Sequence, residues 1–305
     1  MSEPNSALLD DYLAFHRLQT STRDMDPVYP VLRQMADSLS LTDEQRVWLV
    51  VCHVAYYHLG SALRAFAAVP DPARASDAVM DLPVATERRG HWSRRALHRH
   101  LSAVQQVARE DPRGLSGWLM RGLDGGGPRD NWAMLSGRLL SIPGNGRWAA
   151  FKTCEMLQQV CGANVAAPDM GHAHSSGPRK GLGLLYSGLP SGNGPAAVRE
   201  LNRVSDGLVS LMAGAVPSVS VETAETSLCD FHSMSRGGYY PGHDIDKMQH
   251  QLDQVPSELA GAAYAARLQE LPRAYLGELN GWNGVDAGRR KVYRDTGRIP
   301  ERTPQ

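Results

Sequence analysis

The chain has 305 residues, of which 42% are hydrophobic and 21% are charged, a composition that excludes disordered and fibrous proteins. Basic and acidic residues both number 32, so the formal net charge is zero, which argues against a nonspecific nucleic-acid coat. No stretch approaches the roughly 18 apolar residues of a membrane-spanning helix, and the acidic N-terminal segment lacks a signal-peptide pattern, so we expect a cytoplasmic protein.

Apolar residues recur at spacings of three and four along most of the chain, and sustained alternation with a period of two is missing. This periodicity predicts an all-α fold. Thr42, followed by two acidic residues, is a good N-cap for a long helix that reaches about Phe66. The other helices are expected at residues 6–19, 27–39, 93–109, 129–140, 147–160, 196–212, 221–233, 245–255 and 257–271.

Three segments have the composition of loops. Residues 124–128 (DGGGP) form a flexible join, and residues 237–243 (GGYYPGH) combine glycine with aromatic side chains. Residues 162–194 are rich in glycine, proline and serine, and a loop of this length inside a compact domain is usually functional or disordered. The join divides one compact, two-lobed unit into an N-terminal helical region, 1–124, and a second helical region, 125–305.

The four cysteines form no C-x-x-C pair. We therefore expect neither a disulfide framework nor a cysteine zinc site. Buried, reduced thiols are the simplest interpretation of Cys52, Cys154, Cys161 and Cys229.

Eight arginines and histidines lie between residues 88 and 100. Such a run is usually a solvated helix face. The alternative is a stripe that faces the phosphates of a nucleic acid.

The segment 139–155, LLSIPGNGRWAAFKTCE, has the pattern of two helices joined by a tight turn. Pro143 ends the first helix, Gly144 and Gly146 permit close backbone approach, and the small Ala149 and Ala150 face inward from the second. The N–H groups at the start of that helix would point at a phosphate, helped by the helix dipole. An ordinary αα-corner is the alternative. The expected DNA contacts are Ser141, Gly144, Asn145, Gly146, Arg147 and Lys152.

This hairpin resembles the L-P-G-[VI]-G-x-x-T-A segment of the helix-hairpin-helix DNA glycosylase superfamily. The resemblance covers residues 129–171 and implies a helical DNA-glycosylase-like bundle that contains a helix-hairpin-helix. In that superfamily a catalytic aspartate follows the second hairpin helix, and here Asp169 lies 23 residues after Gly146. Two features depart from the pattern: the threonine after the hairpin is missing, and Asp169 is followed by Met-Gly rather than Thr-His.

Polar side chains are concentrated in the segment 222–246, ETAETSLCDFHSMSRGGYYPGHDID. Spacings of three and four place two carboxylates, a thiol and an imidazole on one helix face. A wholly buried face would not carry two carboxylates without partners, and a solvated acidic face is the alternative. The residues of this face are Glu222, Glu225, Cys229 and His232.

The glycine-rich loop after this helix carries Arg236, Tyr239 and Tyr240. Aromatic side chains beside an arginine suit the stacking of an extruded base and the clamping of its phosphates. Anchoring in the core is the alternative for the two tyrosines.

Together with LTDEQRVWLVVCHVAYYHLGSALRAF and GRWAAFKTCEML…SSGPRKGL, this segment resembles the α-glutamyl/putrescinyl thymine pyrophosphorylases, or amino acid:DNA transferases, a helical family encoded by bacteriophages with hypermodified thymine. The shared pattern is E-T-x-L-C-x-[YF]-[KH]…R-x-x-G-Y-Y…D, and the resemblance spans residues 41–246. It implies displacement of pyrophosphate from 5-pyrophosphorylmethyl-uracil in DNA, in the cytoplasm of the bacterial host. The helical domain also occurs in 5-hydroxymethyluracil DNA kinases, but their motif G-x-x-x-x-G-K-[ST] is absent here, which favours the transferase.

The partners implied by this resemblance are double-stranded DNA containing phosphorylated 5-hydroxymethyluracil and a free amino acid or polyamine. The hairpin would hold the DNA backbone while the modified thymine flips into a helical pocket. Arg236, Arg179 and Lys180 would stabilise the charge on the departing pyrophosphate. Further substrate contacts are expected from Glu222, Tyr239 and Tyr240.

A base must take the proton of the incoming ammonium, since only a neutral amine is nucleophilic. The sequence does not identify a cofactor. A divalent cation such as Mg²⁺ could assist the leaving group, but the sequence shows no set of residues that would bind it. His172 and His174 form an H-x-H pair that fits a polar loop better than a metal site. The candidate catalytic residues are Glu225, Asp169, His232, Arg236 and Cys229.

Three functions remain open at this stage. The first is the amino acid:DNA transferase, the second a DNA glycosylase or lyase that uses Asp169 on a flipped base, and the third a non-catalytic helical DNA-binding module. The transferase consumes a pyrophosphorylated thymine and an amine, the glycosylase releases a free base, and the binding module does neither. Segment 222–246 favours the transferase, since a simple glycosylase has no need for it.

Overall fold

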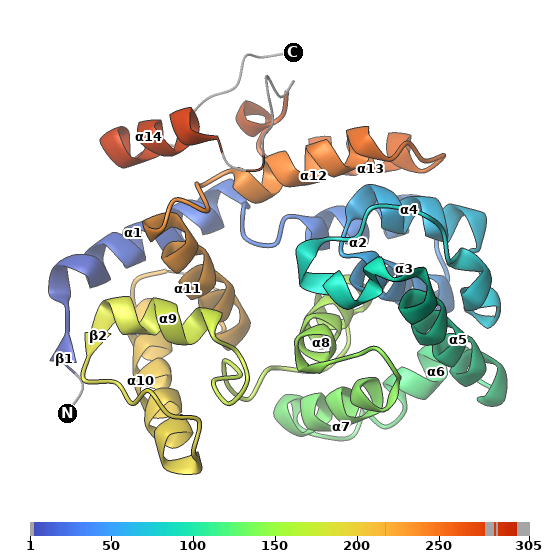
Figure 1. Ribbon diagram of the computed structural model, residues 1–305, viewed down its shortest axis with the longest axis horizontal. Helices are drawn as coiled ribbons and strands as arrows, with labels where there is room; N and C mark the ends of the chain where they lie inside the picture. Colours follow the sequence, from blue (N-terminus) through green and yellow to red (C-terminus); the bar gives the residue numbers. More distant parts are fainter. Residues whose placement is uncertain (1–2, 217, 278–283, 285, 298–305) are drawn as a thin grey trace. The chain divides into compact units, whose positions relative to one another are not determined.

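The computed structural model describes residues 3–216, 218–277, 284 and 286–297, which are helical along most of their length (Figure 1). The predicted all-α fold is confirmed. The sheet within these residues is a single antiparallel pair of short strands, β1 (Glu3–Pro4) and β2 (Tyr186–Ser187). In this described part of the chain, no helix combines the length and the apolar character needed to cross a membrane.

The chain divides into two compact units that are each built from separated segments. Unit 1 comprises Met1–Pro27, Ala167–Lys247 and Leu271–Gln305, and unit 2 comprises Val28–Ala166 and Met248–Glu270. The boundary expected at residues 124/125 therefore lies inside unit 2. The glycine-rich segment 124–128 is held in place by hydrogen bonds, because the buried side-chain amide of Asn131 donates to the carbonyl oxygens of Leu123 at 2.6 Å and Gly126 at 3.3 Å.

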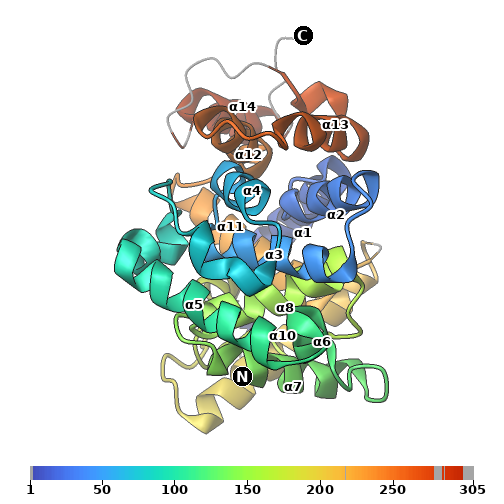
Figure 2. The same ribbon diagram turned by 90° about the vertical axis from the view of Figure 1, so that its right-hand side faces the viewer.

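Unit 2 is organised around α3 (Asp43–Tyr56), in which every residue from 47 to 56 is buried. A helix that is apolar on all sides must be covered on all sides. It packs against α4 (Leu59–Ala68), α6 (Gly114–Met120) and α8 (Arg147–Cys161), which Figure 2 shows together with α5. Its Trp48 indole N–H donates to the carbonyl oxygen of Val69 at 2.7 Å, so the largest buried side chain is also satisfied.

The single helix expected from Thr42 to Phe66 is two helices. Thr42 is the N-cap, as predicted, and forms a capping box with Gln45. The helix ends at Tyr57, whose φ of 49° is left-handed, and α4 restarts at His58, whose Nδ1 accepts the N–H of Ser61 at 3.2 Å. Tyr57 has no sequence signature of a helix end, which explains why periodicity alone missed the break.

The other helices of unit 2 begin and end within a few residues of the predicted positions. The sequence did not predict α6 or the two 3-10 helices of this unit, η1 (Pro72–Ala78) and η2 (Thr86–Trp92). Glu44, which is remote in the sequence, caps the start of α6 by accepting the N–H groups of Leu115 at 2.8 Å and Ser116 at 2.7 Å. The remaining elements are α2 (Val28–Ser38), α5 (Arg94–Glu110), α7 (Pro128–Ser141) and α13 (Ala260–Glu270).

Unit 1 buries a separate apolar core with an aromatic centre. The ring of Phe231 lies 5.4 Å from that of Tyr12 and 5.5 Å from that of Phe15, centroid to centroid. Leucines and methionines from four helices surround these rings. The elements of unit 1 are α1 (Ser6–Thr22), α9 (Gly177–Leu185), α10 (Pro195–Ala213), α11 (Val221–Ser235), η3 (Arg273–Tyr275) and α14 (Ala287–Thr296), and α12 (His243–Gln254) spans the division between the units.

The segment predicted as one loop, 162–194, contains the helix α9. Pro178 occupies its first turn, where proline is tolerated, and Leu182 and Leu185 are buried in the core of unit 1. The glycine content that suggests a loop serves a different purpose here, which is the close packing of α9 on α11.

Candidate functional site

Two glycines bring α9 and α11 into close contact within unit 1 (Figure 1). A Cβ atom on Gly181 would lie 2.3 Å from the backbone oxygen of Leu228, and one on Gly177 would lie 2.5 Å from Sγ of Cys229. Any larger residue would therefore push the helices apart. The polar residues of α9 and those of α11 are held in a fixed relation by this contact.

The carboxylate of Glu222, the first acidic residue of α11, is hydrogen-bonded to the backbone of the same unit. Glu222 is buried, and its Oε1 accepts the backbone N–H of Ala167 at 2.5 Å. This bond fixes the segment that leads to α9. The structure therefore differs from the expectation that Glu222 binds substrate, because its carboxylate is committed to the backbone.

Glu225 and Cys229 lie one turn apart on α11, as their spacing predicts. The Cys229 thiol donates to Oε1 of Glu225 at 3.5 Å. Glu225 is only 9% exposed, whereas Cys229 is half-buried. Glu225 is thus less accessible to a substrate than its position in the sequence suggests.

His232 lies at the exposed end of the same helix, close to two cations. Partial burial, and then the charges of Arg236 and Lys180, lower the pKa of His232 below its usual value. The imidazole is therefore neutral at neutral pH and can accept a proton. Lys180, which was predicted from a separate segment of the chain, is therefore near enough to His232 to act on its charge, as Arg236, from the same segment as His232, does.

A pocket of about 440 Å³ lies along α9 and the segment 189–193 of unit 1. Its volume is within the range of small-molecule sites. The lining combines apolar residues, among them Leu189, Pro190 and Leu201, with the polar and basic residues Ser175, Ser176, Arg179, Lys180 and Asn193. A cavity of this chemistry suits an anion. Lys180 belongs both to this pocket and to the surroundings of His232.

Arg179 shapes the pocket with its guanidinium. Its Nη2 donates to the carbonyl oxygens of Ser191 at 3.1 Å and Gly192 at 2.7 Å, and its Nη1 donates to the Asn193 side chain. These bonds hold the segment 191–193 against α9. The guanidinium of Arg179 is therefore engaged in holding the pocket together, and the exposed ammonium of Lys180 is more accessible to a ligand.

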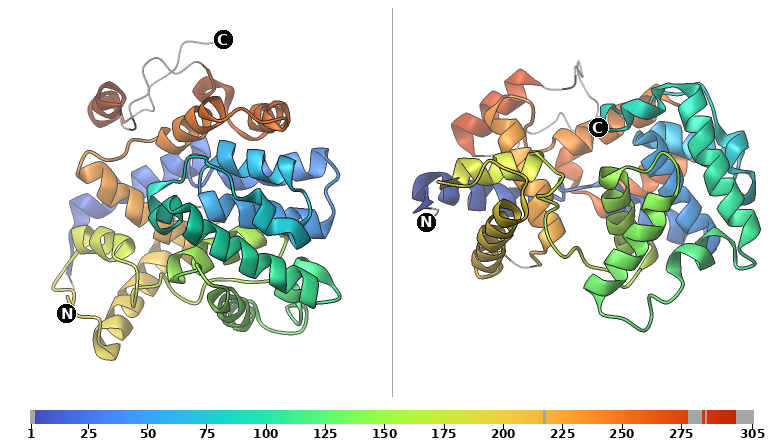
Figure 3. Two further views of the ribbon diagram at one scale, coloured as in Figure 1. Left: turned by 45° about the vertical axis from the view of Figure 1, so that its right-hand side comes forward. Right: turned by 60° about the horizontal axis from the view of Figure 1, so that its bottom comes forward.

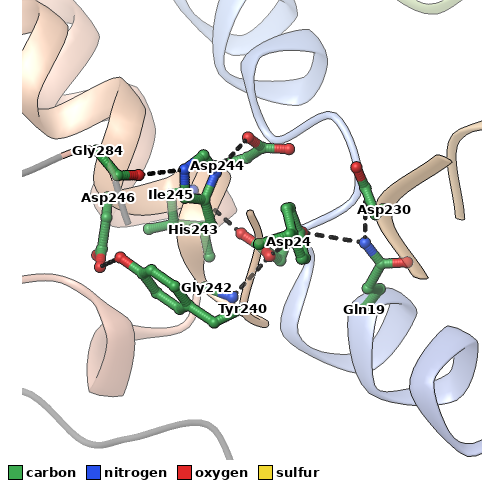
Figure 4. Close-up of polar contacts among 11 residues, drawn as sticks. Gln19, Asp24, Asp230, Tyr240, Gly242, His243, Asp244, Ile245, Asp246 and Gly284 are labelled. Atoms are coloured by element: carbon green, nitrogen blue, oxygen red, sulfur yellow. Dashed lines mark hydrogen bonds and ion pairs between the residues drawn. The ribbon is translucent and has the colours of Figure 1, made fainter. Parts of the chain in front are cut away.

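Tyr239 is buried, with 3% exposure, and belongs to a hydrogen-bonded network around Asp24. Figure 4 shows other members of this network, among them Gln19, Asp230, Gly242 and Ile245. Its hydroxyl donates to Oδ2 of Asp24 at 2.5 Å, and the same carboxylate accepts the N–H groups of Gly242 at 2.6 Å and Ile245 at 3.1 Å. Gln19 donates to both Asp230 and Tyr239. The ring of Tyr239 is enclosed and its hydroxyl anchors the loop 237–243, an arrangement that favours anchoring in the core over the predicted stacking on a base.

Tyr240 is equally enclosed, with 1% exposure. Its hydroxyl donates to Oδ2 of Asp246 at 2.5 Å, and Arg289 of α14 pairs with the same carboxylate. His243 donates from Nε2 to the carbonyl oxygen of Gly284 at 2.6 Å. Anchoring in the core is therefore favoured over base stacking for Tyr240 as well.

The carboxylates of this network perturb one another. Burial, followed by the charge of Asp244, raises the pKa of Asp24 to about 7. The same two causes raise the pKa of Asp230 well above its usual range. No motif in the sequence indicated this cluster, because Asp24 and Asp230 lie more than two hundred residues apart.

Asp169 and His172 have internal partners in unit 1. The two oxygens of Asp169 accept the N–H of Gly171 at 2.7 Å and the side-chain amide of Asn202 at 3.1 Å. His172 is fully buried, its Nε2 lies 2.6 Å from Oγ of Ser205, and burial lowers its pKa to about 4. No group of three or more His, Cys, Asp or Glu side chains in the described residues is arranged to hold a metal ion.

The predicted hairpin lies in unit 2, where α7 and α8 run side by side, in green in Figure 3. The turn between them exposes Gly144, Gly146 and Arg147, and Ala149 and Ala150 are buried as expected. Gly144 has a φ of 90°, and a Cβ there would lie 2.9 Å from Cβ of His100, so this position requires glycine. Gly146 has an ordinary φ of −81° and open space around it.

The carbonyl groups of the turn are held by the basic segment 88–100. Arg88 donates to the oxygen of Gly144 at 3.2 Å, and Nδ1 of His100 donates to the oxygen of Pro143 at 2.7 Å. Arg88 is only 6% exposed, and its Nε has no hydrogen-bond partner in the described part of the chain. Burial lowers its pKa to about 10, so it remains a cation, and its charge lies beneath the turn.

The other predicted DNA contacts differ in their accessibility. Lys152 is buried and its ammonium pairs with Glu155 at 2.8 Å. This position differs from the expectation that Lys152 contacts DNA. The reason is its place in the helix, on the side of α8 that packs on α2 and α3. Ser141 is exposed and donates to the carbonyl oxygen of Arg138, and the Asn145 side chain donates to the carbonyl oxygen of Leu139 at 3.2 Å.

Comparison with known proteins adds one finding. The sequence model of the amino acid:DNA transferase family (ADDT) matches residues 20–240 of this chain. The matched region includes the hairpin of unit 2 and the packed helices α9 and α11 of unit 1. No curated protein matches the chain.

Proposed function

Because this chain belongs to the amino acid:DNA transferase family and is a transferase that acts on DNA, we propose that it transfers an amino acid or polyamine nitrogen to 5-pyrophosphorylmethyl-uracil in double-stranded DNA. The amine nitrogen attacks the 5-methylene carbon of the base and forms a C–N bond. The C–O bond to the pyrophosphoryl group breaks, and pyrophosphate leaves with the electron pair. The proton lost by the amine goes to a base on the protein.

The observation that carries this proposal is the double position of Lys180. Its ammonium lines the basic pocket of unit 1 and also acts on the imidazole of His232. A leaving pyrophosphate needs positive charge where its own charge develops, and a proton acceptor must lie near the attacking amine. Lys180 supports both requirements, with Ser175 and Ser176 as hydroxyl donors in the pocket and Arg236 as a second cation that acts on His232.

We assign the role of base to His232 in preference to the two carboxylates. Its lowered pKa keeps it neutral at neutral pH, and it is only partly buried. Glu225 is nearly enclosed and accepts from the Cys229 thiol, and both oxygens of Asp169 are engaged. The same engagement of Asp169 removes the reason to place a glycosylase ahead of the transferase.

The test is mass spectrometry of nucleosides after incubation of the protein with duplex DNA containing 5-pyrophosphorylmethyl-uracil and a pool of amino acids and polyamines. We expect an amine adduct of thymine and free pyrophosphate. Release of a free base in place of an adduct would support a glycosylase, and no change in the DNA would support a binding module.

Variants of the α9–α11 site identify the groups that act. His232→Gln should lower the rate by roughly 10²-fold or more, the usual contribution of a general base. Lys180→Gln should lower turnover by roughly 10²-fold, and Arg17→Gln, which removes an exposed cation from α1, is the matched control and should retain the full rate. If Glu225→Gln abolishes the reaction while His232→Gln does not, the base is Glu225.

A further inference from the structure

Trp92 is the most exposed large apolar side chain in the described part of the protein, at 60%. It ends η2 in unit 2, and its indole N–H donates to the carbonyl oxygen of Val84 at 2.9 Å. The ring is thus held in one position while most of its surface faces solvent. A tryptophan in this state is costly to hydrate unless it has a partner to stack on.

Four arginines surround Trp92 in the sequence and are exposed: Arg89, Arg94, Arg95 and Arg99. None of them forms an ion pair with another residue that the structure describes. Glu87 is the only acidic residue between 86 and 100. Two of the arginines open α5, where the helix dipole disfavours positive charge. Helix stability therefore does not explain their presence.

The same segment is joined to the hairpin turn by the bonds from Arg88 and His100 to the carbonyl oxygens of residues 143 and 144. Arg88 is more than nine-tenths buried, with an unpartnered Nε among the described residues and a charge that no acid there neutralises. The exposed arginines and Trp92 thus belong to a segment that is hydrogen-bonded to the turn, and we name this segment together with the turn the Trp92 surface.

We propose that the Trp92 surface binds duplex DNA, with the arginines on the phosphates and the Trp92 indole stacked on a base where one pair is opened. Arginine neutralises phosphates and releases counterions, and a base has an apolar face that an exposed indole can cover. This inference rests on the DNA substrate of the proposed function and adds the residues that hold it.

The first experiment measures binding by fluorescence anisotropy of a labelled duplex over a range of salt concentrations. In Arg95→Gln/Arg99→Gln, the slope of log K against log salt should fall by about 0.9 for each phosphate that the protein no longer neutralises. Arg33→Gln is the matched control, because Arg33 is an exposed arginine on α2 of the same unit. An unchanged slope in the double variant, or an equal fall in the control, would overturn the proposal.

The second experiment isolates the indole. Trp92→Leu should weaken binding to a duplex with one unpaired thymine by about fivefold or more, the loss expected for one stacked base. Binding to the fully paired duplex should change less, and the salt slope should not change, because no charge is removed. Trp92→Phe should restore part of the affinity. Equal affinity of Trp92→Leu and the wild-type protein for both duplexes would exclude the stacking role.

The two proposals fail in different ways. If the wild-type protein forms no amine adduct but the variants lose DNA affinity as described, the Trp92 surface stands and the proposed reaction is wrong. If the adduct forms at the full rate in Trp92→Leu and in the arginine variant, and their DNA affinity is unchanged, the reaction stands and the surface is wrong. Circular dichroism and thermal unfolding of each variant confirm that the fold is retained.

Discussion

Replacement of Gly181 by alanine should separate the two helices that carry the candidate site. The added Cβ would lie 2.3 Å from the backbone oxygen of Leu228, whereas an ordinary van der Waals contact begins at 3.4 Å. The obstacle is backbone, which cannot rotate away, so α9 must move by about 1 Å, and such overpacking destabilises a fold by about 1–3 kcal/mol. A displacement of about 1 Å at a catalytic site can lower the rate by roughly 10²-fold. Lys180 moves with the helix.

The assay combines urea unfolding with the rate of amine transfer, in Gly181→Ala and in the control Gly207→Ala. Gly207 is an exposed glycine within α10 of the same unit, and a Cβ there meets nothing within 4 Å. Alanine at that position should raise the free energy of unfolding by about 0.5–1 kcal/mol and leave the rate unchanged. Wild-type stability and rate in Gly181→Ala would refute the close packing of α9 on α11 and the site built on it.

Three other measurements test the electrostatics. Lys180→Met should raise the pKa of His232 in an NMR titration, because one of the cations that lower it is removed. Lys152→Met should lower the free energy of unfolding by about 3–5 kcal/mol in urea, because it leaves Glu155 buried without its cation. The pKa of Asp24 is raised to about 7 in the folded state, so its contribution to the free energy of unfolding is largest below about pH 4 and is lost as the pH rises to about 7. Asp24→Asn should therefore make the free energy of unfolding depend less on pH between about 4 and 7.

Local chemistry made most helices of this fold predictable from the sequence. Apolar spacing located the helices, and the N-cap at Thr42 located the start of α3. The break after α3 was not predictable, because it depends on a left-handed Tyr57, a residue that carries no turn signal. The two-unit division was not predictable either, since each unit gathers segments that are remote in the chain.

The candidate site was predictable only in part, because the burial of a polar residue depends on partners far away in the sequence. Glu225, Cys229 and His232 share a face of α11, as helical spacing dictates. Tyr239 looked like a stacking residue beside Arg236, but Asp24, 215 residues earlier, takes its hydroxyl and the core takes its ring. Nothing within the loop itself distinguishes the two outcomes.

The sequence of α9 carries a signal for its close packing on α11. Gly177 and Gly181 are four residues apart, the spacing that places two small residues on one face of a helix. Glycines in a segment that also contains proline and serine suggest a loop. The same spacing, combined with the apolar Leu182 and Leu185, indicates a short helix packed closely on a neighbour, and this is what the structure contains.

Histidines lie next to cations on the Trp92 surface and on α11, and the consequences differ because their exposure differs. On the Trp92 surface, burial and the charge of Arg88 lower the pKa of His91 to about 4. Burial, together with His91 and Arg88, lowers the pKa of His100 to about 3. Each neutral ring donates its Nδ1 proton to a backbone carbonyl, so the positive charge there resides on arginine and does not change near neutral pH. On α11 the cations act on His232, which is only partly buried and can exchange its proton with a substrate. We therefore expect any pH dependence of the reaction near neutrality to originate from unit 1, because the positive charge beside the hairpin turn does not change in that range.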